Sequence, residues 1–230
     1  MIRTKIIGFG LPLLALAMTA HAGTVTFQTA PGATESGGGA VNAKAVITTS
    51  AGQVGITLTN LLPNPTDVAQ LLSDFSFTLS GATSGPSLLS SSGQEITIAS
   101  GGGTTLGNTV AAGWILSSPS TGTYLLNDLG AGGAGPAHLI IGPGPYTSAN
   151  GSIAGNGPHN PFLNGSATFT LNIAGVTTDT TVSNVVFSFG TTSGNNVPGG
   201  PNSTIPEPVS LSLVGGGLLA LGLLRKRMPR

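Results

Sequence analysis

Apolar and polar residues alternate with a period of two along much of the chain between residues 23 and 190. The clearest case is 167–173, where Ala, Phe, Leu and Ile alternate with Thr and Asn. A period of two places every apolar side chain on one face of a strand. The same alternation occurs at 25–27, 54–58, 75–79, 96–98 and 185–189, and short apolar runs lie at 114–116, 124–126 and 138–141. We therefore expect about ten short strands.

The expected strands are separated by clusters of Gly, Pro, Ser and Asn, and no sustained helical pattern interrupts them. This arrangement is typical of a single antiparallel β-sandwich or jelly-roll-like domain, which we place at 23–190. One stretch, Thr66 to Leu72, favours a helical turn capped by Thr66 or Asp67. The Gly-, Pro- and Asn-rich stretch 131–161 predicts a functional or a mobile loop, and 191–204 predicts a flexible spacer.

The first 22 residues have the three parts of a signal peptide. Arg3 and Lys5 form a basic start, an apolar run follows from Ile6 to Met18, and Ala20-His21-Ala22 places small residues where signal peptidase reads. The apolar run is too short to span a membrane as a stable helix. We predict cleavage after Ala22, so that the mature chain begins at Gly23. The alternative is a buried N-terminal helix.

The last residues, 205–230, also have a defined order. Pro206-Glu207-Pro208 is followed by an uncharged apolar segment, 209–224, and then by Arg225-Lys226-Arg227. The apolar segment reaches about 24 Å as a helix, short of a hydrocarbon core of roughly 30 Å. Thinning of the bilayer and snorkelling of the basic side chains permit a short transmembrane helix with its basic end in the cytoplasm. The alternative is an ordinary C-terminal anchor whose prolines start the helix.

The order of these C-terminal features, together with a signal peptide, resembles the PEP-CTERM sorting domain of exported bacterial proteins. The resemblance implies processing by exosortase, an integral-membrane cysteine protease or transpeptidase, in bacteria that secrete exopolysaccharide and form biofilms. It covers only 205–230. Within the motif, the two prolines hold the backbone extended for a protease, while Glu207 offers one charge to a receptor pocket. The protein would be membrane-associated through its C-terminus and then lie at the cell surface or outside the cell.

Charge and composition limit which kinds of partner can bind the chain between the two terminal segments, here called the body. Between Gly23 and Ile205 the only cation is Lys44, against six acidic residues. Binding to nucleic acid requires clustered Lys and Arg, so the body is not expected to bind it. The chain contains no cysteine, which excludes disulfides and thiol nucleophiles.

Candidate catalytic groups are sparse, and we predict no enzyme, no cofactor and no metal site. No Gly-x-Ser-x-Gly elbow and no His-x-His or Asp-x-Asp-x-Asp-Gly ligand spacing is present. Glu95 with Asp74 or Asp128 could supply the two carboxylates of a glycosidase, although paired acids are more often solvated surface. His138 is expected to be a strand-edge residue, and His159 to stabilise a turn by a hydrogen bond.

With catalysis and nucleic-acid binding not expected, two hypotheses for the function of the protein remain. The first is a structural or adhesive protein of an extracellular polysaccharide matrix, which the sorting tail favours. The second is a carbohydrate-binding module in which Trp114, Tyr124 or Tyr146 stacks on sugar rings. For Trp114, which stands in the run Ala-Gly-Trp-Ile-Leu, we favour the alternative of a position in the core. Exposure of these aromatic side chains separates the two hypotheses, because a core position for all three would exclude stacking on sugars.

Overall fold

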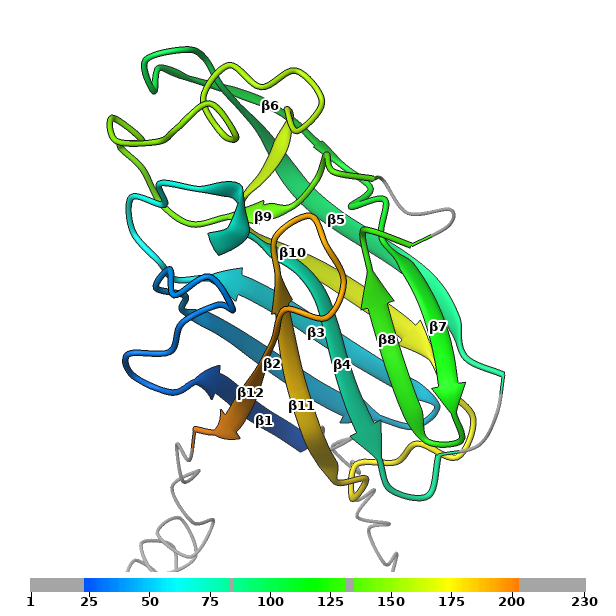
Figure 1. Ribbon diagram of the computed structural model, residues 1–230. Coiled ribbons are helices and arrows are strands. Elements are labelled where there is room, and N and C mark those ends of the chain that lie inside the picture. Colours follow the sequence, from blue (N-terminus) through cyan, green and yellow to red (C-terminus); the bar gives the residue numbers. More distant parts are fainter. Residues whose placement is uncertain (1–22, 83–84, 131–134, 203–230) are drawn as a thin grey trace, which may run out of the picture.

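The computed structural model describes residues 23–82, 85–130 and 135–202, and these fold as an all-β domain, as predicted (Figure 1). The expected signal helix at 1–22 and transmembrane helix at 209–224 lie outside the described residues. The strands are β1 (Gly23–Thr29), β2 (Ala43–Ser50), β3 (Gln53–Asn60), β4 (Leu72–Leu79), β5 (Ser87–Ile98), β6 (Thr104–Val110), β7 (Ile115–Ser120), β8 (Thr123–Asn127), β9 (Ile140–Ile141), β10 (Phe162–Asn172), β11 (Val182–Phe189) and β12 (Asn196–Pro201).

All described strands belong to one continuous sheet, in the order β6-β5-β10-β3-β2-β1-β12-β11-β4-β8-β7. The two-residue strand β9 pairs with both β10 and β4, so it closes eight of the strands into a ring. The prediction of an all-β domain is therefore confirmed, but its strands form one closed sheet instead of a sandwich, with two halves that face each other across a core. The fold turns from one half to the other at the pairing of β1 with β12.

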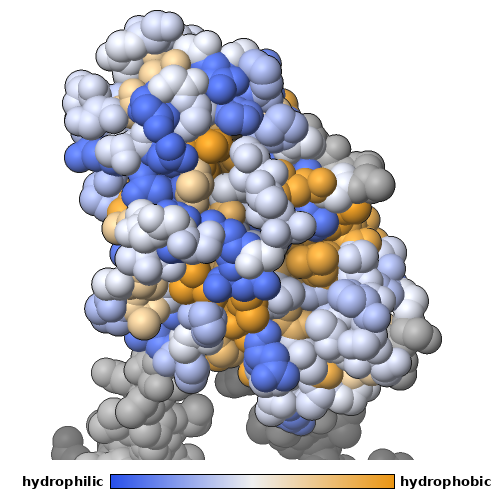
Figure 2. Space-filling model, viewed as in Figure 1, coloured by the Kyte–Doolittle hydropathy of each residue, from blue (hydrophilic) through white to orange (hydrophobic). Residues whose placement is uncertain are grey.

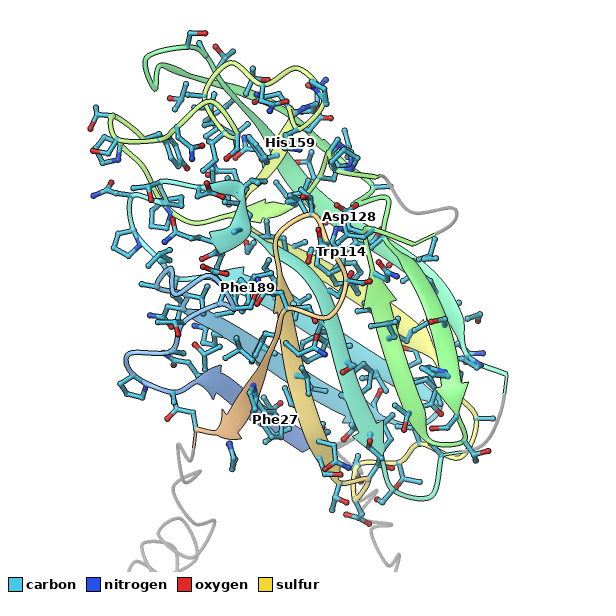
Figure 3. The ribbon with its side chains drawn as sticks, in the orientation of Figure 1. Phe27, Trp114, Asp128, His159 and Phe189 are labelled. Atoms are coloured by element: carbon cyan, nitrogen blue, oxygen red, sulfur yellow. The ribbon has the colours of Figure 1, made fainter. Side chains whose placement is uncertain are left out.

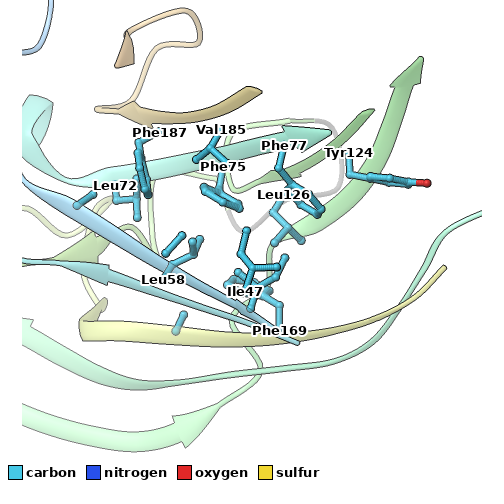
Figure 4. Close-up of a cluster of buried hydrophobic side chains, with 14 of the residues drawn as sticks. Ile47, Leu58, Leu72, Phe75, Phe77, Tyr124, Leu126, Phe169, Val185 and Phe187 are labelled. Atoms are coloured by element: carbon cyan, nitrogen blue, oxygen red, sulfur yellow. The ribbon is translucent and has the colours of Figure 1, made fainter. Parts of the chain in front are cut away.

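The main core lies between these two halves. Figure 4 shows Phe75, Phe77 and Phe187 from β4 and β11 facing Ile47 and Phe169 from β2 and β10. All five side chains are buried. Burial of one such side chain stabilises the fold by about 1.5–3 kcal/mol, which explains why the apolar positions of each strand keep to one face.

Strand β2 was not among the expected strands, although its burial alternates regularly. Ala43, Ala45 and Ile47 face the core, and β2 pairs in register with β3, placing Ile47 opposite Ile56. The outward Val46 interrupts the sequence alternation, and small alanines give a weak hydrophobic signal. Strand β6 was also missed, because its residues are mostly exposed and carry no alternation.

The predicted helical turn is confirmed as a short 3-10 helix, Val68–Gln70, capped by Asp67. The Asp67 carboxylate accepts a hydrogen bond from the Ala69 amide at 2.8 Å, and the Gln70 side chain accepts one from the Asp67 amide at 3.2 Å. These two bonds satisfy amides that the helix leaves without intrahelical partners.

The irregular stretch before β10 closes the upper end of the domain in Figure 1, and its described part carries a second apolar cluster. Leu139, Tyr146 and Ile153 from this stretch pack with Ile98 and Phe162. Residues 135–161, here called the cap, are therefore ordered around a small apolar core that is separate from the main one.

The prediction of a flexible spacer over 191–204 is wrong for Asn196–Pro201, which form β12 between β1 and β11. The composition resembles a linker because close packing demands glycine here. A Cβ on Gly199 would lie 2.7 Å from side-chain atoms of both Phe187 and Val185. Val197 supplies the one buried large side chain of the strand.

Both ends of the described chain lie at the lower end of the molecule as drawn in Figure 1. β1 and β12 are antiparallel, with Phe27 opposite Pro201. The Asn202 amide donates to the Thr26 carbonyl at 2.7 Å, one step beyond β12. Gly23 and Asn202 therefore leave the sheet at the same pole, opposite the cap.

Candidate functional site

The predicted export and sorting residues lie outside the described residues. They are Ala20 and Ala22 at the signal cleavage site, Pro206, Glu207 and Pro208 of the motif, and Arg225, Lys226 and Arg227 of the basic cluster. Within residues 23–82, 85–130 and 135–202, no helix is long and apolar enough to cross a membrane.

The three aromatic residues considered as glycan contacts are all buried, so the core position favoured for Trp114 is confirmed and the stacking hypothesis is wrong for this structure. Trp114 is 2%, Tyr124 0% and Tyr146 3% exposed. Trp114 packs against Phe169 with ring centroids 5.4 Å apart, and Tyr124 packs against Phe77 at 5.6 Å. Each ring fills core volume, so none presents a face to a sugar.

Two of these aromatic side chains also satisfy their polar atoms inside the protein. The Trp114 indole N–H donates to the His138 carbonyl at 3.1 Å, and the Tyr146 hydroxyl donates to the Gly142 carbonyl at 2.8 Å. Burial raises the pKa of the Tyr146 phenol, because the charged form would lose its hydration. Figure 3 shows Trp114 inside the domain.

His138 joins four parts of the chain. Its Nε2 lies 3.1 Å from Glu95 Oε1 on β5, and its Nδ1 lies 3.1 Å from the Ala112 carbonyl between β6 and β7. Its amide donates to the Pro161 carbonyl at 3.0 Å, before β10, while its own carbonyl accepts from Trp114. The expectation of a strand-edge position was close, since His138 precedes β9 by two residues.

The His138 ring lies between a backbone carbonyl and a carboxylate. Both ring nitrogens have an oxygen within hydrogen-bond distance, and the His138 and Glu95 side chains are 18% and 24% exposed. Sequence spacing could not reveal this contact, because 43 positions separate the two residues.

His159 fulfils the predicted role in a turn. Its Nδ1 lies 2.6 Å from the Ser152 carbonyl, within the cap at the upper end of the domain (Figure 3). Asn160 reinforces the same segment, donating from its side chain to the Asn156 carbonyl at 2.9 Å. The group holds the cap together and is not arranged around an open cleft.

The proposed carboxylate partners of Glu95 lie on the other half of the sheet. Asp74 is on β4, and Asp128 follows β8, with the Asp128 amide donating to the Ser73 carbonyl at 3.1 Å. Asp74 is 5% and Asp128 0% exposed, so neither carboxyl faces an open cleft. Loss of hydration raises the pKa of Asp74 to about 6, and the backbone amides of Asp128 and Leu129 lower it in part.

A polar pocket of about 490 Å³ lies between the turn at Glu35, the capped 3-10 helix and the β11–β12 loop. The Glu35 carboxylate accepts from the amides of Gly37 and Gly39, the latter at 2.6 Å. Asp67 is bonded to Ala69 and, through its second oxygen, to the Asn150 side chain at 2.6 Å. These carboxylates are used to fix loops. No group of three or more His, Asp or Glu side chains that could hold a metal occurs in the part of the chain that the structure describes.

An apolar groove of about 580 Å³, here called the lower groove, lies where β12 ends between β1 and β11. Figure 2 shows apolar surface over β11 and β12 in this region. Its apolar lining includes Val25, Phe27, Val182, Val185, Val186, Pro198 and Pro201. A smaller groove of about 390 Å³ adjoins it at Val25 and Val182 and continues toward Gly23. Sequence reasoning missed both grooves, because they depend on where β12 stops.

Comparison with known proteins gives no relative: no family model, no curated protein and no solved structure matches the chain.

Proposed function

We propose that the chain is an exported bacterial cell-surface protein, sorted and processed through its C-terminal Pro-Glu-Pro signal, with a non-enzymatic body that is structural or adhesive in an extracellular polysaccharide matrix. Signal peptidase and an exosortase-type membrane protease would be its processing partners. The membrane would hold the C-terminus until processing.

The two terminal signals in the sequence carry this proposal. The predicted signal cleavage site precedes Gly23 of β1, and the Pro-Glu-Pro motif begins at Pro206, beyond β12. Removal of both terminal segments would leave every described strand intact, so the described fold is compatible with a precursor that is cut at both ends.

The position of the ends supports the same function. Gly23 and Asn202 lie at one pole, so a membrane-held tail would place that pole toward the membrane and the cap around His159 away from it (Figure 1). Only residues 203–208 would separate the domain from the expected span, about 20 Å when fully extended. The cap and the outer faces of the strands would then meet the matrix.

The chemistry of the outer faces suits a hydrated polysaccharide. Hydroxyl groups pair across neighbouring strands there, as in Thr24 with Thr48 at 3.1 Å and Ser92 with Thr168 at 3.1 Å. Such a surface offers hydrogen bonds to water and sugar hydroxyls without strong electrostatic attraction. The single lysine of the body gives polyanionic glycans little to bind by charge.

Intact mass of the protein recovered from its native host tests the processing. We expect a mass that begins at Gly23 and ends near Pro206, with or without an added anchor. A combined Pro206→Ala, Glu207→Ala and Pro208→Ala variant should retain the tail, whereas an Asp179→Ala variant on the exposed surface should be processed normally. A wild-type mass that still contains Arg225 to Arg230 would contradict the proposal.

Location and matrix binding are tested on the same material. The processed protein should sediment with the exopolysaccharide fraction and be lost from it when the polysaccharide is degraded. Recovery of all the protein in the medium, whether or not polysaccharide is present, would contradict a structural or adhesive role.

A further inference from the structure

The lower groove opens where the sheet lacks part of a strand. β12 pairs with β11 only over 196–198 and with β1 only over 199–201. Below these pairings, no β12 residue pairs with residues 23–25 of β1 or with residues 182–185 of β11 in the described chain. The groove occupies this gap, and its floor is apolar.

In this gap, β1 directs backbone N–H and C=O groups to the side on which β12 would continue. Within a strand, successive residues direct their N–H and C=O groups to opposite sides. Thr26 directs its carbonyl toward Asn202, which donates to it at 2.7 Å. Thr24, two residues earlier, therefore directs its backbone groups to the same side, beyond the end of β12.

The register decides which residue of the tail would meet the groove. Residues directly opposite one another share a face, and Phe27 lies opposite Pro201. Extending the pairing places Ser203 opposite Val25 and Ile205 opposite Gly23. Val197, Gly199, Pro201, Ser203 and Ile205 then share the inward face, so Ile205 is the next large apolar side chain available to it.

Space for Ile205 lies beside Gly23, toward Val25, and not on Gly23 itself, where a Cβ would lie 2.5 Å from the Thr178 carbonyl oxygen. The lower groove and the smaller groove meet there, at Val25 and Val182. The next residue, Pro206, has no N–H and would end the pairing. An apolar groove, unpaired strand groups and an apolar residue in register thus coincide at the point where the chain leaves the domain.

We propose that residues 203–205 dock in the lower groove as a continuation of β12, with Ile205 between Val25 and Val182. Docking would leave Pro206-Glu207-Pro208 directly at the lower edge of the domain, with no free linker before it. The consequence for processing rests on the proposed function: a protease that cuts near the motif would find its substrate extended and fixed on the N-terminal side. The docking itself does not depend on any protease.

Cysteine pairs test the register in the full chain, purified in detergent micelles. Because the chain contains no cysteine, no native thiol competes with an introduced pair. Val25→Cys with Ser203→Cys places two thiols opposite each other at a non-hydrogen-bonded position, where a disulfide fits. Val25→Cys with Thr204→Cys is the matched control, since residue 204 would face outward. We expect disulfide formation at least about tenfold faster for the first pair than for the second.

Equal rates for the two pairs would overturn the proposal, since a free tail brings residues 203 and 204 to Val25 equally often. A disulfide-linked dimer of the single Val25→Cys variant would also overturn it, by assigning the groove to a second copy of the chain. Failure of exosortase-type processing would remove the proposed function and leave this result unaffected.

Amide exchange gives a second measurement that needs no disulfide. The Thr24 amide should be protected in the wild-type chain, and Ile205→Asp should accelerate its exchange about tenfold or more. Thr204→Asp introduces the same charge on the outward face and should leave the exchange of Thr24 unchanged. Unprotected Thr24 in the wild-type chain would overturn the proposal.

Discussion

Glu95 and His138 are separated by 43 positions in the sequence, yet Glu95 Oε1 lies 3.1 Å from His138 Nε2, which links β5 to the segment before β9. The His138 imidazole also lies within hydrogen-bond distance of the Ala112 carbonyl, and the His138 backbone carbonyl accepts a hydrogen bond from the Trp114 indole. His138 therefore fixes both the β6–β7 connection and Trp114, the only tryptophan of the chain.

Replacement of His138 should destabilise the domain more than replacement of the other described histidine. His138→Ala removes two ring contacts, leaves Glu95 without its partner, and places alanine at a φ of 66°. We expect a loss of about 2–4 kcal/mol in the free energy of unfolding. Urea unfolding followed by Trp114 fluorescence measures it.

His159→Ala is the matched control, because it removes one hydrogen bond in the cap. Its expected cost is about 1 kcal/mol. Equal losses for the two histidine variants would contradict a special role for His138.

Asp74 makes stability depend on pH. Its pKa is raised to about 6 in the folded state by loss of hydration, so the folded protein keeps this proton to higher pH than the unfolded chain. The contribution of Asp74 to stability therefore falls as the pH rises from about 4 to about 6 and is constant above that. Asp74→Asn should be more stable than wild type at pH about 7.5, by up to about 2–3 kcal/mol, and gain nothing below pH about 4.

Asp179→Asn on the exposed surface is the control for this pH series. Its difference from wild type should be small and nearly constant across the range. A stabilisation by Asp74→Asn that is equally large at acidic and neutral pH would show that burial of the charge is not its cause.

Gly199 tests the packing of β12. Gly199→Ala would place a Cβ 2.7 Å from Phe187 and Val185, which are both buried. The strand must shift to accept it, and we expect a loss of about 1–3 kcal/mol in the free energy of unfolding. Gly103→Ala, where no atom lies within 4 Å of the added Cβ, should be close to neutral. A neutral Gly199→Ala variant would show that β12 is not held tightly between its neighbours.

The cap of the 3-10 helix gives a fourth prediction. Asp67→Ala removes the bonds to the Ala69 amide and the Asn150 side chain and should cost about 1–2 kcal/mol. Asp67→Asn keeps an acceptor for the Ala69 amide and should recover most of that loss. Thermal unfolding of the three proteins checks the order.

The strands that could be predicted are those with one buried face and large side chains at every second position, such as β3 and β10. β12 could not be predicted, because its place between two strands requires small residues, and the sequence around Gly199 therefore resembles a linker. Local composition cannot distinguish a glycine chosen for flexibility from one chosen for close approach.

The candidate site residues likewise divide into those whose roles depend on neighbours in the sequence and those whose roles depend on the fold. The turn at Asp67 and the hydrogen bond of His159 depend on neighbours in the sequence, and both were predicted. The apolar run around Trp114 also favoured its core position, but the core positions of Tyr124 and Tyr146 and the pairing of Glu95 with His138 depend on contacts between distant segments. Side-chain type alone fits a sugar platform as well as a core, so only the fold could decide between them.

The placement of β12 has a mechanical consequence. Pulling on the chain beyond Asn202, away from the cap, applies force along the axis of this strand. The hydrogen bonds to β1 and β11 then resist shear together, whereas a strand pulled sideways from an edge unzips one bond at a time. A domain tethered in this way would transmit tension through its sheet.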